Sequence, residues 1–368
     1  MSEIKSSRIL TFDLLRGYFL VAIILDHLAY YPNLLDWWSG RGNLFVSSAE
    51  GFFFISGIVL GIVRGAKLIK EPFRIPATLL LKRGAQLYIT AVVLMLFFTF
   101  VGWLFLTNPG LKPGIRLPEE NIFDIIWGGL TFQYIYGWAD YLRLYAIYIL
   151  ASPIALWLLR KDLWYVLLGV SALIWMQFPH SKLETMELSQ VYSWQLVFFG
   201  GLTVGFYWQQ IRSWWSKISL PVRKVMVTAT VSLAAVSMVA CFLLAYGTDL
   251  LGLDPAFKQA FDLLYPTFAK EALYLPRLLL FLLWFWAAFW LFWRLEPFII
   301  RWAGWLFMSF GTNSLYVYTI QAFLVFFLHL VIPSATSSVI LNLLLSALGV
   351  LLVWVAVRTK FLMGIIPR

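Results

Sequence analysis

Residues 12–31, FDLLRGYFLVAIILDHLAYY, decide what kind of protein this is. The run is apolar and long enough to cross a bilayer, which takes about 20 helical residues. It nevertheless carries Asp13, Arg16, Asp26 and His27. Ionisable side chains inside a membrane cost free energy and usually face a protein interior or a wet cavity. We therefore expect a membrane helix that carries part of a functional site.

The composition of the whole chain is that of a membrane protein. Of its 368 residues, 61% are hydrophobic and only 12% are charged, against about 25% charged in an ordinary soluble domain. The net charge of +10 comes from basic residues spread over short loops, which argues against nucleic acid as a partner. The single cysteine, Cys241, excludes an intramolecular disulfide. Three scattered histidines argue against zinc, so we expect no metal.

The apolar runs predict about ten transmembrane helices in one domain, residues 1–368, of an all-α polytopic integral membrane protein. The predicted spans are 11–31, 44–63, 84–106, 140–159, 163–178, 191–210, 225–246, 275–293, 303–330 and 337–357. Most basic residues then lie on the side of the N-terminus, so the positive-inside rule predicts that both termini are cytoplasmic. Residues 122–139, in the longer outer segment 107–139, should dip back as a short or re-entrant helix.

Helix geometry places Arg16 and His27 on one face of the first span. Eleven residues turn an α-helix by about 1100°, or three turns plus roughly 20°, and advance it by about 16 Å. Asp13 is close enough to Arg16 to pair with it, whereas Asp26 is turned about 100° from His27 and should point elsewhere. The alternative is that these groups lie at the two membrane interfaces, with Arg16 reaching the lipid headgroups.

The second predicted span begins with a carboxylate. In SSAEGFFFISGIVLGIVRG, Glu50 lies at the outer end, at the level expected for His27 on an antiparallel neighbour. A carboxylate that faces an imidazole can fix its tautomer, although an ordinary interfacial carboxylate is the alternative. Ser56, Gly57 and Gly61 are small residues that permit close helix packing.

Five stretches carry a resemblance to a known family. The first two are RILTFDLLRG, which contains Arg16 and is followed by His27, and AEGFFFISGIVLG, which contains Glu50. They resemble the first and second helices of the membrane acyltransferase-3 superfamily. The other three, DYLRLYAIYILASPIALWLL, YSWQLVFFGGLTVG and FGTNSLYVYTIQAFL, resemble its OpgC-type branch, which succinylates periplasmic glucans.

The resemblance implies a multi-pass enzyme of the bacterial inner membrane. Such enzymes move an acyl group from cytoplasmic acyl-CoA to a hydroxyl of a periplasmic or cell-surface glycan. The expected partners are therefore membrane lipid, acetyl-CoA or succinyl-CoA as donor substrate, and a carbohydrate acceptor. No permanently bound cofactor is expected, and the oligomeric state is left open.

The candidate catalytic residues are His27, Arg16 and Glu50. A histidine that titrates near neutrality suits a general base, with an acyl-histidine intermediate as the alternative. Arg16 could hold anionic or carbonyl groups of the donor. The candidate substrate-binding residues are Asp13, Asp26, Arg143, Trp194, Gln195, Asn313 and Ser314.

Several of these residues also have simpler interpretations. Trp194 and Gln195 could bind a sugar ring, but Trp is also an ordinary interfacial anchor. Asn313 and Ser314 could cap or pack a helix start. Outside the candidate set, His180 is expected to be solvated and His329 to be interfacial.

Two other functional classes compete with an enzyme. One is a transporter or flippase of an anionic lipid or glycan, with Arg16, Arg143 and Arg277 along its path. The absence of internal repeats and of paired Gly/Pro-broken helices counts against it. The other is a non-catalytic membrane sensor on the same fold. Binding of acyl-CoA would separate the enzyme from both.

Overall fold

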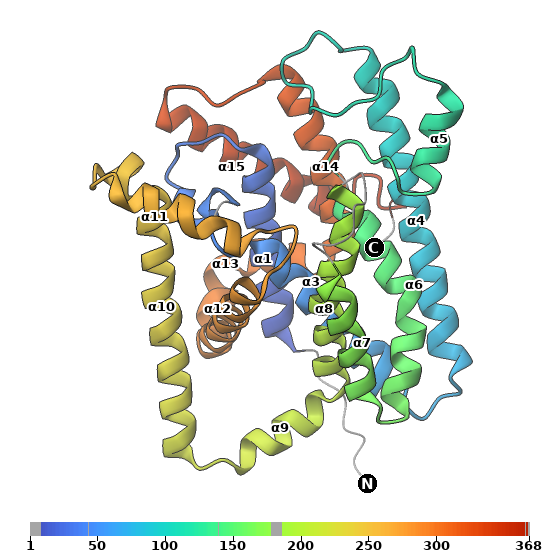
Figure 1. Cartoon of the computed structure of the whole chain (residues 1–368), viewed down its shortest axis with the longest axis vertical. Coiled ribbons are helices and arrows are strands. Elements are labelled where there is room, and N and C mark those ends of the chain that lie inside the picture. Colours follow the sequence, from blue (N-terminus) through green and yellow to red (C-terminus); the bar gives the residue numbers. More distant parts are fainter. Residues whose placement is uncertain (1–8, 43, 139, 178–185, 365, 367–368) are drawn as a thin grey trace.

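The computed structural model describes residues 9–42, 44–138, 140–177, 186–364 and 366. Throughout these residues the secondary structure is helical, without strands, as Figure 1 shows, so the all-α prediction is confirmed. The main helices are α1 (Leu10–Leu28), α3 (Ser48–Leu60) continued by η2 (Gly61–Ala66), α4 (Arg74–Trp103), α6 (Asp140–Arg160), α7 (Trp164–Met176), α8 (Met186–Phe206), α10 (Leu220–Leu251), α12 (Leu275–Arg294), α13 (Glu296–Thr312), α14 (Ser314–Val331) and α15 (Val339–Thr359). Shorter helices are α2 (Asp36–Ser39), η1 (Gly40–Gly42), α5 (Ile122–Leu130), α9 (Trp208–Lys217), α11 (Ala256–Leu264) and η4 (Tyr265–Phe268).

Seven helical segments in the described part of the chain are long and apolar enough to cross a membrane. They are α3 with η2, α4, α6, α10, α12, α14 and α15. The protein is therefore a multi-pass membrane protein. The number of ten spans stays a prediction, because α1 carries Asp13, Arg16 and Asp26, and α7 has only 13 residues.

The predicted span 303–330 is wrong in its start, because residues 303–312 belong to a separate helix, α13, and the helix long enough to cross a membrane is α14. The chain leaves helical geometry at Asn313, where φ is −121° and ψ is 36°, so that α13 ends and α14 begins there. The Asn313 amide donates a hydrogen bond to the Ser309 carbonyl oxygen at 2.9 Å. Asn competes for backbone groups in this way and favours helix ends over helix interiors.

Helix α13 packs across the N-terminal half of α1. At its start, the Thr11 hydroxyl donates to the Glu296 carboxylate at 2.6 Å. Near its end, the α-carbon of Gly311 lies so close to the Asp13 carbonyl oxygen that a β-carbon there would be 1.8 Å away. Both ends of α13 therefore lie beside the first turns of α1, and α14 alone continues through the bundle.

The segment after residue 121 forms a short helix, as predicted, and the chain then lies against α4. Helix α5 ends at Leu130, whose carbonyl oxygen accepts a hydrogen bond of 2.6 Å from Tyr88, midway along α4. Phe132 follows with a positive φ of 60°. The Arg143 guanidinium donates to the Phe132 carbonyl oxygen at 3.1 Å. The buried Arg143 thus holds the turn after α5 in place.

Helices α3 and α8 are in backbone contact, which confirms the predicted close packing at Gly57 and Gly61. A β-carbon on either glycine would lie 2.2 Å from a carbonyl oxygen of α8. The reciprocal contacts are made by Gly201 and Gly205 of α8 against carbonyl oxygens of α3. The Ser56 hydroxyl bonds within its own helix, to the Phe52 carbonyl oxygen at 2.7 Å.

This packing makes Gly57→Ala destabilising. The added methyl would meet the Phe198 carbonyl oxygen, so the two helices must separate, at about 1–3 kcal/mol of unfolding free energy. Gly169→Ala on α7 is the matched control, because nothing lies within 4 Å of its β-carbon position and alanine has the higher helix propensity. Thermal unfolding in detergent should show a lower midpoint for Gly57→Ala alone. Equal midpoints would contradict the close packing.

Candidate active site

A cavity of about 40 Å³ lies between the helices at the C-terminal end of α1. Its lining residues are Ile23, Asp26 and His27 of α1, Ser47, Ala49, Phe52 and Phe53 at the start of α3, Tyr141 of α6, Lys270 before α12, and Tyr318 of α14. We call it the outer cavity, after the side of the membrane on which the predicted topology places it. Elements distant in sequence thus meet around His27.

His27 is half-buried and is oriented by a neutral amide. Its Nδ1 lies 3.1 Å from Oε1 of Gln321, which is fully buried in α14. With the amide oxygen as acceptor, Nδ1 carries the proton and Nε2 keeps a free lone pair. The Trp138 ring packs against the imidazole with 5.0 Å between centroids. The arrangement suits a proton acceptor at Nε2.

The predicted contact between Glu50 and His27 is not formed. Glu50 is fully buried, and its Oε1 accepts a hydrogen bond of 2.6 Å from Arg277 Nε. Its Oε2 accepts from the Ser47 backbone N–H at 3.1 Å and from the Ser47 hydroxyl. A capping box turns a carboxylate at this position back over the helix start. The buried guanidinium of Arg277 pairs with the other carboxylate oxygen of Glu50, because a buried charge without a partner costs much free energy.

Asp26 borders the outer cavity together with His27, but its carboxylate turns to Tyr31 whereas His27 turns to Gln321, so the two side chains point in different directions as predicted. Helix α1 ends at Leu28, and the outer cavity extends over this end, so two successive residues border it. The Tyr31 hydroxyl donates to Asp26 Oδ1 at 3.0 Å and is 2.7 Å from the Ser39 hydroxyl. Asp26 is thereby anchored to the loop that follows α1.

Arg16 and Asp13 lie deeper along the same helix. Because α1 is continuous, the helical face predicted to join Arg16 to His27 is preserved. Asp13 is buried against α13, as the Gly311 contact shows. Neither residue lines the outer cavity, so their roles toward a substrate stay predictions.

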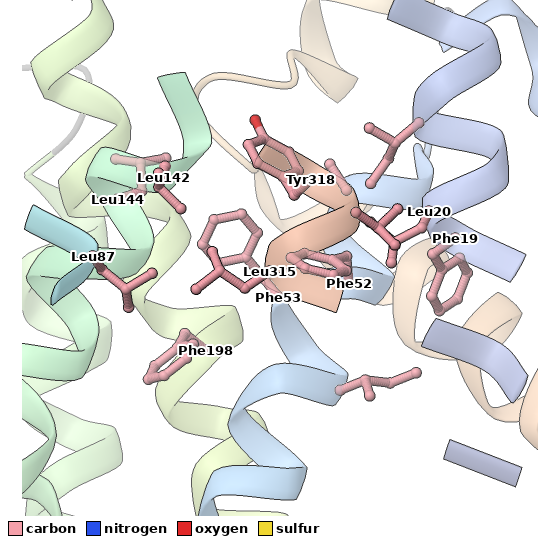
Figure 2. Close-up of a cluster of buried hydrophobic side chains, with 14 of the residues drawn as sticks. Phe19, Leu20, Phe52, Phe53, Leu87, Leu142, Leu144, Phe198, Leu315 and Tyr318 are labelled. Carbon is pink, nitrogen blue, oxygen red and sulfur yellow. The ribbon is translucent and has the colours of Figure 1, made fainter. Parts of the chain in front are cut away.

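A second cavity, of about 30 Å³, adjoins the first. Its lining residues are Phe52, Arg83, Tyr141, Leu142, Tyr145, Ser314, Leu315 and Tyr318. We call it the inner cavity, because Arg83 and Ser314 lie near the predicted cytoplasmic ends of α4 and α14. The two cavities share Phe52, Tyr141 and Tyr318. Figure 2 shows Tyr318 and Leu315 beside Phe52. The Phe52 and Tyr318 rings, with 6.4 Å between centroids, therefore lie where the two cavities meet.

Trp194 and Gln195 pack outside the lining of the outer cavity and support it. Trp194 is fully buried and packs against Phe53 and Tyr141, with ring centroids 5.3 and 5.2 Å apart. It therefore backs the wall of the outer cavity instead of facing a sugar. The Gln195 amide donates to the Ser171 carbonyl oxygen at 2.6 Å, which joins α8 to α7. Arg143 and Asn313 likewise serve the scaffold through the backbone contacts described above.

Of the two remaining histidines, the structure describes only His329, which lines neither cavity. His329 Nε2 lies 3.0 Å from the Leu28 carbonyl oxygen. His180 lies outside the described residues. Within the described part of the chain, no three His, Cys, Asp or Glu side chains gather as metal ligands.

Sequence reasoning missed several polar residues near His27. Asp140, at the start of α6, is the carboxylate that acts electrostatically on His27, and it lies 3.8 Å from the Lys112 ammonium. Lys112 also lies 4.7 Å from the centre of the Trp138 ring. A signal was available for Gln321, because an uncharged amide inside the apolar run of α14 needs a polar partner. Lys112 and Asp140 looked like ordinary loop charges.

Together these features define a class: an all-helical, multi-pass membrane protein with an oriented histidine in a cavity between its helices. Comparison with protein families then identifies the family. The family described as OpgC protein matches residues 8–363, nearly the whole chain, and the protein belongs to it. Comparisons with curated proteins and with solved structures found no match. The predicted resemblance to the OpgC-type branch is thus confirmed, and membership indicates an acyltransferase that modifies glucans.

Proposed function

We propose that this protein transfers an acyl group, acetyl or succinyl, from cytoplasmic acyl-CoA to a hydroxyl of a periplasmic or cell-surface glycan. The bacterial inner membrane is the compartment that brings such a donor and acceptor to opposite faces of one protein. The observation that carries the proposal is His27, held through Nδ1 by Gln321 within a cavity of a membrane bundle. An oriented proton acceptor in such a cavity supports acid–base chemistry on a hydroxyl group.

The reaction assigned to His27 is general-base catalysis. Nε2 takes the proton of the acceptor hydroxyl as its oxygen forms a bond to the thioester carbonyl carbon. The tetrahedral intermediate then breaks the carbon–sulfur bond, and the imidazolium returns the proton to the departing thiolate. The products are an O-acyl glycan and free CoA, and His27 ends neutral as it began. Asp140 stabilises the transient imidazolium through its nearby negative charge.

The donor is proposed to reach His27 from the inner cavity. Arg83 and Ser314 border this cavity, and the start of a helix such as α14 favours negative charge. These features suit a donor with anionic groups. Arg16, lower on the face of α1 that bears His27, is proposed to hold the donor in the same half of the protein. The acceptor would then enter the outer cavity.

Reconstituted protein provides the test. Proteoliposomes with labelled acyl-CoA on one side and periplasmic glucan on the other should incorporate label into the glucan in a protein-dependent manner. The purified protein should also bind acyl-CoA, which a flippase or a sensor does not need. Failure of both binding and transfer would refute the proposed function. Empty liposomes are the control for leakage of either substrate.

A further inference from the structure

Among the described residues that line the outer cavity, Lys270 is the one lysine or arginine. It lies in the turn between η4 and α12, outside the spanning helices. Its ammonium nitrogen is 5.7 Å from the centre of the Tyr141 ring. Among the described residues, no carboxylate lies within ion-pair distance of this ammonium, whereas the neighbouring Glu50 is paired with Arg277. The charge of Lys270 is therefore not used in an internal ion pair.

The surroundings keep Lys270 positively charged. Burial lowers the pKa of the ammonium, but the nearby Tyr141, Glu50 and Asp26 outweigh it, so the pKa is raised above its ordinary value. Glu50 is already paired with Arg277, and Asp26 accepts a hydrogen bond from Tyr31. A substrate anion entering the cavity would thus meet a cation that no protein carboxylate has neutralised by contact.

We infer that Lys270 selects an acyl group that ends in a free carboxylate, such as succinyl, by pairing with that carboxylate while the thioester carbonyl lies at His27. The inference rests on the proposed function and concerns the residue that recognises the far end of the acyl group. A base and a cation border one cavity of about 40 Å³, and a dicarboxylic acyl group presents a thioester carbonyl and a carboxylate only a few bonds apart. An acetyl group would leave the ammonium desolvated and unpaired, and sites built for a polar partner reject ligands that lack it. Lys270 takes no part in bond making or breaking.

Two other roles for Lys270 make different predictions. If its ammonium stabilised the oxyanion of the tetrahedral intermediate, its loss would slow succinyl and acetyl transfer equally. If it only held the loop before α12, its loss would lower stability without changing the preference between donors. The ratio of the two transfer rates therefore isolates the selective role.

The test compares Lys270→Gln with Lys258→Gln, an exposed lysine of α11. Succinyl-CoA and acetyl-CoA compete for the same glucan, and the ratio of the two kcat/KM values is measured. Lys270→Gln should lower the succinyl-to-acetyl ratio at least about 30-fold, as expected for loss of a charge partner, and Lys270→Arg should retain most of it. Lys258→Gln should leave the ratio unchanged.

A parallel fall for both donors, or an unchanged ratio, would overturn the inference. A measurement on the wild-type protein covers the case in which Lys270→Gln does not fold. Succinyl-CoA should compete for binding more strongly than butyryl-CoA, which has the same number of acyl carbons and no carboxylate. Equal competition would also overturn the inference. Wild-type protein that transfers neither acyl group would instead refute the proposed function, and the selectivity with it.

Discussion

His27→Ala should lower the rate of acyl transfer to glucan by at least about 10², the typical effect of losing a general base. The substitution removes the imidazole without adding charge or bulk, and Gln321 loses only a single hydrogen bond. The variant should therefore fold and still bind acyl-CoA. Transfer of labelled acyl groups, measured at equal protein level in membranes, gives the rate.

Two further variants sharpen this comparison. His27→Gln can still form a hydrogen bond with Gln321 but cannot accept the hydroxyl proton, so it should be as inactive as His27→Ala. His180→Ala, in a loop that the sequence predicts to be solvated, should act almost normally. If His27→Ala transferred acyl groups at nearly the wild-type rate, His27 would not be the base, and its place at the helix end would be structural.

Arg277→Met should cause the largest loss of stability, about 3–5 kcal/mol of unfolding free energy. Arg277 and Glu50 are both fully buried and form an ion pair, with Nη2 and Oε1 2.5 Å apart. Removing the guanidinium leaves a buried carboxylate without its counter-charge. The midpoint of thermal unfolding in detergent, together with the yield of folded protein, measures the effect.

The chain offers matched controls for this ion pair. Lys258 and Asp249 form a pair of 3.1 Å with both side chains about half exposed, so Lys258→Ala should change stability by at most about 1 kcal/mol. The double variant Glu50→Gln/Arg277→Met should be more stable than Arg277→Met, because it buries no unpaired charge. A Glu50→Gln variant that is fully stable but inactive would instead restore a catalytic role for Glu50.

The sequence by itself determined the class of protein and pointed to His27 as the candidate catalytic residue. A bilayer demands about 20 apolar residues for each helical crossing, which is a local property of the chain, so most helices could be located without knowing their neighbours. The same demand made His27 conspicuous, because a titratable group in an apolar run calls for an explanation. Gly57 and Gly61 were predictable as packing residues for a similar reason, since small side chains in a membrane helix serve close approach.

Only the tertiary structure decided which polar groups meet. Glu50 could have faced His27 at the level where the sequence placed it, but the packing of α12 brought Arg277 to it instead. Gln321 contacts His27, and Lys270 borders the same cavity as His27. Both residues are more than two hundred positions away from His27 in the sequence. The sequence offered Asn313 and Ser314 as a possible helix start, but only the structure shows that α13 ends there and α14 begins as a separate helix. Which polar side chains pair depends on how the helices rotate and cross, and on which arrangement leaves no buried charge without a partner. Both are properties of the whole fold and cannot be read from a local stretch of sequence.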